Sequence, residues 1–211
     1  MTELSNIASK YLTDKGVTYL NSHKYTEIYD RYFNEFRKTN NKVFILEIGV
    51  QRGYDLLMIN EYFKGNCEIY GLDIDLSNLE IELPDNIHVF EIDASNNENL
   101  AKLYESKLEY SLFNIPYFDI IIDDGSHKSN EIISSLLFFK DKLSDDGIYI
   151  IEDLHCDISS GALQYLVFYN KDVDDQIKLS YSLKSCNIYQ SFKKTTYDFN
   201  RSICAILKFK N

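Results

Sequence analysis

The sequence DIIIDDGSHKSNE, residues 119–131, joins three isoleucines to a run of charged and polar side chains. A run this apolar is typical of a strand buried on both faces of a parallel sheet, so the aspartates that end it are expected at the carboxyl edge of the sheet. In open α/β folds ligands bind at this edge. A solvated turn in which Asp124 and Ser126 cap the next helix explains the same stretch without a ligand. The stretch alone does not decide between the two.

Four other apolar runs have the same form, and helix-length segments separate them. They are VFILEIG (43–49), EIYGLDID (68–75), IHVFEID (87–93) and GIYIIED (147–153). Alternating strands and helices predict βαβ units and a mainly parallel sheet. Two more strands are expected at QIKLSYSL (176–183) and SICAILKF (202–209), as a closing antiparallel pair joined by a polar stretch. The sequence therefore predicts an α/β fold with seven strands.

The chain length and the net charge limit the number of domains and the kinds of partner. The 211 residues predict one domain, 1–211, with 41–211 as its core and 1–40 as a helical lid or an added layer. Within the N-terminal segment Ile28, Tyr32 and Phe36 recur at helical spacing. A net charge of −11 argues against nucleic acid or an anionic membrane as the main partner. No stretch has the form of a signal peptide or a membrane span, which predicts a cytoplasmic protein.

A glycine turn follows the first strand, in ILEIGVQRGYD (45–55). A dinucleotide-binding turn would have glycine where Glu47 stands, because backbone must approach a pyrophosphate there. A carboxylate suits a cationic ligand instead, although a tight turn with an incidental acid gives the same pattern. Asp73 ends the next strand, where nucleotide-binding α/β folds place a carboxylate on the ribose hydroxyls.

The spacing E-x-G-x-x-x-G of Glu47, Gly49 and Gly53 resembles the cofactor turn of class I S-adenosylmethionine-dependent methyltransferases. The resemblance implies their Rossmann-like fold and cofactor. It also implies that Asp93, which follows the third strand, contacts the adenine ring.

Three stretches are similar to a narrower branch, the macrolide-sugar O-methyltransferases and cephalosporin hydroxylase-like proteins. They are DKGVTYLNSHKYTEIYDRYF (14–33), DIIIDDGSH (119–127) and GIYIIEDLH (147–155). The resemblance implies magnesium ligands at Asp124, Glu152 and Asp153 and a general base at His127. It implies cofactor contacts at Tyr25 and Thr26, although VTYLN (17–21) departs from the shorter connection of the family pattern.

If the fourth and fifth strands are neighbours, their ends lie roughly 5 Å apart, and the acids that leave them can converge on one ion. Magnesium prefers oxygen ligands and keeps positions open for water or substrate. In such a site Asp123 is expected to point away or to support the ligands. These features predict magnesium-dependent methyl transfer from S-adenosylmethionine to a hydroxyl of a sugar, a glycoconjugate precursor or a secondary metabolite, with His127 taking the proton.

Two alternatives remain at this point. His127, His155 and one neighbouring acid form the ligand types of a non-haem iron oxygenase. A catalytically inactive subunit that binds S-adenosylmethionine is the second. The sequence does not identify the acceptor or the oligomeric state, and a homo-oligomer is compatible with it.

Overall fold

A computed structural model describes residues 1–17, 23–105, 117–154, 183–194 and 199–209 of the chain. In this part of the chain, seven strands form one sheet in the order β3-β2-β1-β4-β5-β7-β6. The strands are β1 (Val43–Ile48), β2 (Cys67–Asp73), β3 (Ile87–Glu91), β4 (Phe118–Asp123), β5 (Leu143–Ile151), β6 (Leu183–Lys194) and β7 (Phe199–Phe209). The first five are parallel, and β7 runs antiparallel to β5 and β6. The predicted α/β fold with an antiparallel C-terminal pair is confirmed.

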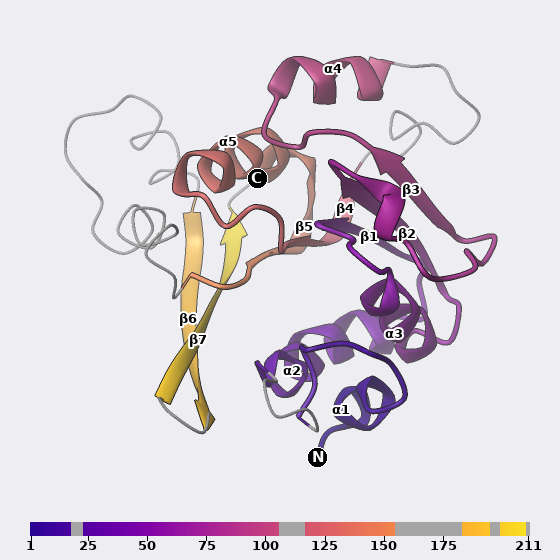
Figure 1. Cartoon of the computed structure of the whole chain (residues 1–211), viewed down its shortest axis with the longest axis vertical. Helices are drawn as coiled ribbons and strands as arrows, with labels where there is room; N and C mark the ends of the chain where they lie inside the picture. Colours follow the sequence, from indigo (N-terminus) through magenta and orange to yellow (C-terminus); the bar gives the residue numbers. More distant parts are fainter. Residues whose placement is uncertain (18–22, 106–116, 155–182, 195–198, 210–211) are drawn as a thin grey trace.

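The four central parallel strands are apolar on both faces because helices cover each face. On one face lie α1 (Glu3–Ala8), α2 (Tyr25–Lys38) and α3 (Tyr54–Tyr62), and on the other α4 (Asn97–Glu105) and α5 (Ser129–Phe139) (Figure 1). Two short 3₁₀ helices, η1 (Leu76–Asn78) and η3 (Lys140–Lys142), lie in the connections. Within the described ranges, no helix combines the length and apolar composition that crossing a lipid bilayer requires.

The N-terminal segment is part of the packed core. Tyr25, Tyr29 and Phe33 of α2 are at most 1% exposed and pack in one cluster with side chains of β1 and α3. Ile28, Tyr32 and Phe36, which the spacing singles out, lie beside this stripe and are partly buried. On this face of the sheet, α1 contacts both α2 and α3.

The position of the sixth strand differs from the expectation. It covers Leu183–Lys194, most of which the sequence suggested to be a polar connection, while residues 176–182 lie outside the described part of the chain. β6 is at the edge of the sheet and pairs with β7 alone. An edge strand has fewer buried neighbours, so its apolar pattern is weaker than that of the central strands.

Candidate active site

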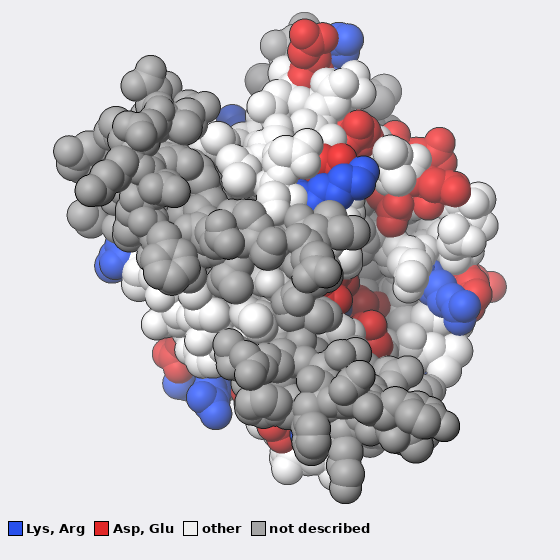
Figure 2. Space-filling model, turned by 60° about the vertical axis from the view of Figure 1, so that its left-hand side comes forward, with Lys and Arg blue, Asp and Glu red and all other residues white. Residues whose placement is uncertain are grey.

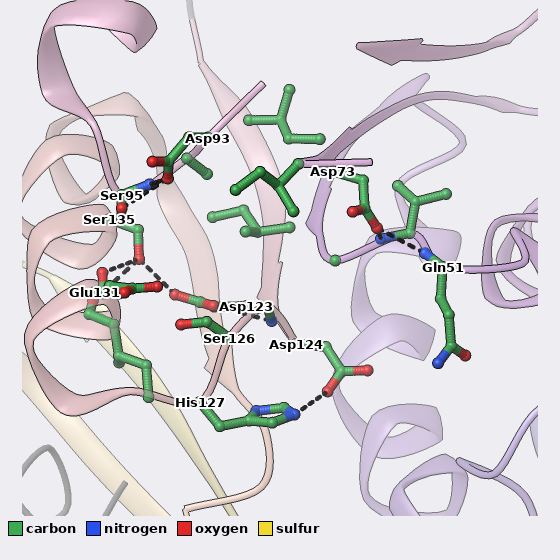
Figure 3. A pocket seen from close by; sticks show the side chains of 18 of the residues that line it. Gln51, Asp73, Asp93, Ser95, Asp123, Asp124, Ser126, His127, Glu131 and Ser135 are labelled. Atoms are coloured by element: carbon green, nitrogen blue, oxygen red, sulfur yellow. Dashed lines mark hydrogen bonds and ion pairs between the residues drawn. The ribbon is translucent and has the colours of Figure 1, made fainter. Parts of the chain in front are cut away.

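A cavity of about 380 Å³ opens at the carboxyl ends of the parallel strands. Its walls come from the segments that follow β1, β2, β3, β4 and β5, as expected for a ligand site in an open α/β sheet (Figure 3). Eight acidic residues line it and, among the described residues, no lysine or arginine does. The acids are Asp14, Asp55, Asp73, Asp93, Asp123, Asp124, Glu131 and Asp153. Figure 2 shows carboxylate side chains inside a recess of this face.

Gly49, the first glycine of the turn after β1, brings two strand ends together. Its φ is +89°, and its backbone N–H donates to the carbonyl of Leu72 at 2.8 Å. A Cβ atom at this position would lie 2.2 Å from the carbonyl oxygen of Asp124. Only glycine therefore allows the turn after β1 to lie against the segment after β4.

Gly53 has a different environment from the one expected. The resemblance places Gly53 in the cofactor turn, but Gly53 does not line the cavity. A Cβ atom here would lie 2.7–2.8 Å from side-chain atoms of Ile81 and Leu79. The φ of +83° and this close packing are the reasons for glycine in the structure.

Asp73 and Asp93 line the cavity from the ends of β2 and β3. Oδ2 of Asp73 accepts hydrogen bonds from the backbone N–H groups of Val50 and Gln51, both at 2.8 Å. Oδ1 of Asp93 accepts hydrogen bonds from the backbone N–H and the hydroxyl of Ser95 (Figure 3). A carboxylate has about four acceptor positions, so both acids retain capacity for ligand hydroxyl or amino groups.

Glu47 is buried below the cavity and does not line it. Its side chain is 1% exposed, and within the described part of the chain neither carboxyl oxygen has a hydrogen-bond partner. Burial raises the pKa of Glu47 well above its ordinary value, against the opposing charge of Lys15, whose Nζ lies 3.9 Å from Oε1. Glu47 is therefore directed toward Lys15, and its expected contact with the cofactor stays a prediction.

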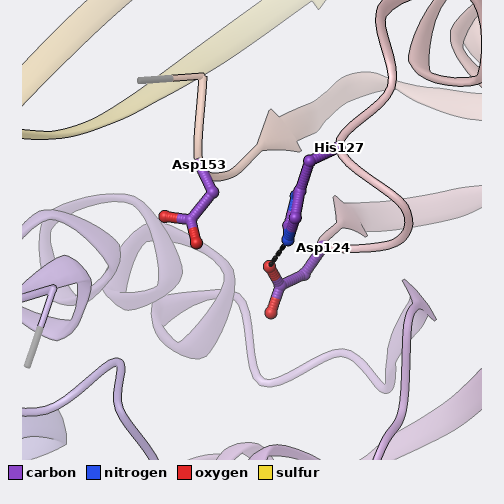
Figure 4. Close-up of side chains that lie close together, drawn as sticks. All are labelled: Asp124, His127 and Asp153. Atoms are coloured by element: carbon purple, nitrogen blue, oxygen red, sulfur yellow. Dashed lines mark ion pairs between the residues drawn. The ribbon is translucent and has the colours of Figure 1, made fainter. Parts of the chain in front are cut away.

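Asp124, His127 and Asp153 form a group that has the donor atoms of a metal site (Figure 4). One ligand atom from each lies within 4.8 Å of the others. Asp124 follows β4, His127 lies three residues on, and Asp153 follows β5, which pairs with β4. His127 and Asp153 have φ values of 59° and 52°. Such values are uncommon for residues other than glycine and occur often at functional sites.

Glu152, the third expected ligand, is not a member of this group of three but contacts the same Lys15 as Asp124. Its side chain is 2% exposed and accepts hydrogen bonds from Lys15 Nζ, at 3.0 Å, and from the hydroxyl of Tyr29. Burial, together with the charge of Asp124, raises the pKa of Glu152 well above its ordinary value, and Lys15 opposes this. Glu152 is thus directed toward Lys15 and Tyr29 in the interior, whereas Asp153 lines the cavity.

Asp123 also points away from the group, as expected. Its carboxylate accepts hydrogen bonds from the hydroxyls of Ser135, at 2.6 Å, and Tyr149, at 3.2 Å. Burial raises the pKa of Asp123 to about 6. The acid therefore joins the end of β4 to α5 and β5.

Two residues near the start of α2 contact Asp153. The hydroxyl of Tyr25 lies 2.7 Å from Oδ1 of Asp153, and Nδ1 of His23 lies 2.9 Å from the same oxygen. Burial alone would lower the pKa of His23, but the hydrogen bonds and charges of Asp14 and Asp153 outweigh it and raise the pKa to about 9. Thr26, the other expected cofactor contact on this helix, is buried and its hydroxyl bonds to that of Ser5 at 2.9 Å.

The sequence interpretation missed Lys15. Its side chain is fully buried among four carboxyl groups, those of Asp124, Glu152, Asp55 and Glu47. Burial alone would lower the pKa of Lys15, but these charges raise it well above its ordinary value. The one signal in the sequence was the dipeptide Asp14–Lys15, which begins the motif at residues 14–33.

Comparison with known proteins gives consistent relatives, although no family model matches the sequence. Over 72% of the chain, it is 33% identical to demethylmacrocin O-methyltransferase of Streptomyces fradiae and to mycinamicin VI 2''-O-methyltransferase of Micromonospora griseorubida. The match covers 36% of each relative, so the chain corresponds to about a third of their length.

Solved structures give the same grouping. The MycE methyltransferase of the mycinamycin biosynthetic pathway, in complex with Mg and SAH, superposes with a TM-score of 0.72 and 26% identity. The superposition covers 99% of this chain and 55% of that one. A complex that also contains mycinamycin VI gives the same TM-score at 25% identity.

Proposed function

Because the chain has the Rossmann-like fold of class I methyltransferases and is a homologue of the macrolide-sugar O-methyltransferases, we propose that it methylates a hydroxyl of a sugar-containing acceptor, using S-adenosylmethionine and magnesium. The observation that supports this most directly is the group Asp124, His127 and Asp153 at the edge of the same cavity that Asp73 and Asp93 line. A cofactor site and a metal site thereby share one space. The cavity volume lies in the range of small-molecule sites.

The cavity fits the methyl donor in position and charge. S-adenosylmethionine carries a positively charged sulfonium and an amino group, which an acid-lined cavity attracts. Gly49 and the turn after it form one wall, Asp73 accepts ribose hydroxyls, and Asp93 faces the adenine end. Glu47 contributes from below by compensating Lys15 rather than by direct contact.

The donor atoms of the second group fit a hard divalent cation. Asp124 and Asp153 supply carboxylate oxygens, which magnesium prefers, and are proposed as its ligands. Glu152, expected as a third ligand, is engaged by Lys15 and Tyr29 and supports the site from the interior. When bound, magnesium polarises and orients an acceptor hydroxyl.

His127 is placed to take the acceptor proton. Its imidazole is 30% exposed and lines the cavity, with Nε2 4.0 Å from Oδ1 of Asp124. The neutral imidazole accepts the proton while the acceptor oxygen forms a bond to the methyl carbon. The bond from that carbon to sulfur breaks, and its electron pair stays on sulfur as S-adenosylhomocysteine forms. Asp124 lies where it stabilises the imidazolium that results.

The negative charge of the cavity also affects which acceptors it binds. With eight acids and no lysine or arginine among its described lining residues, the cavity disfavours phosphate groups. We therefore expect neutral or cationic glycosides to be better acceptors than nucleotide-linked sugars. The same acidity and the net charge of −11 support a partner other than nucleic acid.

The iron-oxygenase alternative has less support than methyl transfer. It requires two histidines and one carboxylate, whereas the described group contains two carboxylates and one histidine. His155, its second histidine, lies outside the described residues.

A screen with labelled S-adenosylmethionine and magnesium tests the proposal. Macrolide glycosides, other neutral glycosides and nucleotide-linked sugars serve as acceptors, with calorimetric binding of S-adenosylhomocysteine measured in parallel. We expect cofactor binding and transfer of label to a glycoside hydroxyl. Cofactor binding without transfer to any acceptor would favour the inactive-subunit alternative. Iron content with oxygen-dependent turnover would favour the oxygenase.

A further inference from the structure

Lys15 lies at the inner side of the proposed metal site. Its Nζ is 2.5 Å from Oδ2 of Asp124 and 3.0 Å from the carboxylate of Glu152. Asp55 and Glu47 are further away, at 3.5 and 3.9 Å. The side chain is fully buried, so water does not compete for these contacts. A buried ammonium requires such compensation, and the carboxylates in turn depend on it.

The two oxygens of Asp124 face different neighbours. Oδ2 accepts the hydrogen bond from Lys15, whereas Oδ1 is the atom nearest to the imidazole of His127, at 4.0 Å. The contact with Lys15 thereby fixes the rotation of the carboxylate and leaves Oδ1 on the cavity side. Figure 4 shows the Asp124 carboxylate directed toward His127 in this orientation.

The backbone holds Lys15 in place. Its N–H donates to the hydroxyl of Thr13 at 3.1 Å, and its carbonyl accepts the N–H of Thr26 at 3.1 Å. The same segment supports the second strand-end acid, because Tyr25 donates to Oδ1 of Asp153 at 2.7 Å. The described residues on the two sides of this connection, 13–17 and 23–26, thus contact the acids that leave both β4 and β5.

We propose that Lys15 and Tyr25 are positioning residues that orient Asp124 and Asp153 for a divalent cation. The inference rests on the proposed function, since it concerns the same metal site. Magnesium requires near-octahedral geometry, so a ligand free to rotate binds it less well. Partners that orient ligands typically change metal affinity by about 10- to 100-fold when removed. Replacing Lys15 also removes a positive charge close to the site, which by itself favours binding of a cation. We expect the loss of ligand orientation to have the larger effect, so that metal affinity falls.

The experiment measures binding of Mn²⁺, as a paramagnetic substitute for Mg²⁺, to the whole chain in the presence of S-adenosylhomocysteine. Lys15→Met removes the ammonium and keeps the length of the side chain. Lys10→Met is its matched control, because Lys10 is 59% exposed and pairs with Glu61, away from the cavity. Both variants change the net charge equally. Calorimetry of S-adenosylhomocysteine and a thermal melt accompany each measurement.

We expect Lys15→Met to weaken Mn²⁺ binding by about 10- to 100-fold and S-adenosylhomocysteine binding by less than about twofold, with Lys10→Met like the parent. Unchanged or tighter Mn²⁺ binding by folded Lys15→Met overturns the inference while the proposed function stands. An equal loss of both ligands also overturns it, because it indicates a general structural role. A parent chain that binds S-adenosylhomocysteine but no Mn²⁺ overturns both the inference and the metal part of the proposed function.

If Lys15→Met does not fold, Tyr25→Phe decides. This variant removes one hydroxyl and keeps the buried ring, and Tyr62→Phe in the same core cluster is its control. Weaker Mn²⁺ binding by Tyr25→Phe alone supports the positioning role. Binding equal to that of Tyr62→Phe overturns it.

Discussion

Asp73 Oδ2 lies 2.8 Å from the backbone nitrogen of Gln51, so the acid at the end of β2 holds the turn that follows β1. The same oxygen accepts the N–H of Val50, and Oδ1 accepts that of Asp75 at 3.1 Å. These bonds connect two segments that line the cavity. Asp73 therefore has two tasks in the proposed cofactor site, shaping the turn and receiving the ribose.

The first prediction concerns this carboxylate. Asp73→Asn should weaken S-adenosylhomocysteine binding at least about 10-fold, because an amide offers one acceptor oxygen where the carboxylate uses two. Calorimetry measures the affinity. Asp75→Asn is the control, since it makes the same charge change at an exposed residue whose carboxylate accepts the N–H of Ser77. Equal losses in the two variants would contradict a specific role for Asp73.

The second prediction concerns Gly49, where the turn after β1 lies directly against the segment after β4. Gly49→Ala should lower the free energy of unfolding by at least about 3 kcal/mol, because the cost of the positive φ and the cost of the clash with the Asp124 carbonyl add. Gly65→Ala is the matched control. It also has a positive φ, 73°, but no atom within 4 Å of the added Cβ, so about 1–2 kcal/mol is expected. Urea unfolding measures both, and equal costs would show that the close approach at Gly49 contributes nothing.

The third prediction concerns removal of the metal. Exhaustive chelation should abolish methyl transfer and added magnesium should restore it. S-adenosylhomocysteine binding should survive, because Asp73 and Asp93 belong to β2 and the segment after β3, whereas Asp124 and Asp153 follow β4 and β5. Chelator presaturated with magnesium is the control for direct inhibition. Full turnover in chelated protein would remove the metal from the mechanism.

The sequence predicted the parallel sheet well because its strands are buried on both faces. Continuous apolar runs such as Ile120–Ile122 are typical of strands in this position, and the acids that end four of the five runs then fall at one edge of the sheet. The edge strand β6 was misplaced because its residues alternate weakly and its pairing partner is β7 alone. The glycine turn was located correctly, but the packing of Leu79 and Ile81 against Gly53 depends on a loop that the pattern does not place.

The electrostatic part of the site was less predictable. Lys15 contacts Asp124 and Glu152 across 109 and 137 residues, and a single lysine has no periodicity that would place it inside the core. Its contacts in turn explain why Glu47 and Glu152 lie in the interior. Motif spacing indicated which acids gather near the sheet edge. It did not indicate which of them face the cavity and which face Lys15.

The last prediction concerns His127, whose imidazole has two possible tasks. As a general base it takes the acceptor proton, and its removal should lower kcat by about 10²- to 10⁴-fold with Mn²⁺ affinity nearly unchanged. As a metal ligand it should contribute to Mn²⁺ affinity, since one of its ring nitrogens lies within 4.8 Å of carboxylate oxygens of Asp124 and Asp153. His127→Gln therefore separates the roles when turnover and Mn²⁺ binding are measured on the same preparation.

We expect the base. His127→Gln should keep the Mn²⁺ affinity of the parent and, with magnesium saturating, lose most of its turnover. His88→Gln is the control, since His88 pairs with Glu68 on neighbouring strands, outside the cavity. A variant that keeps most of its rate would show that another group takes the proton. A rate restored by higher metal concentration would make His127 a ligand instead.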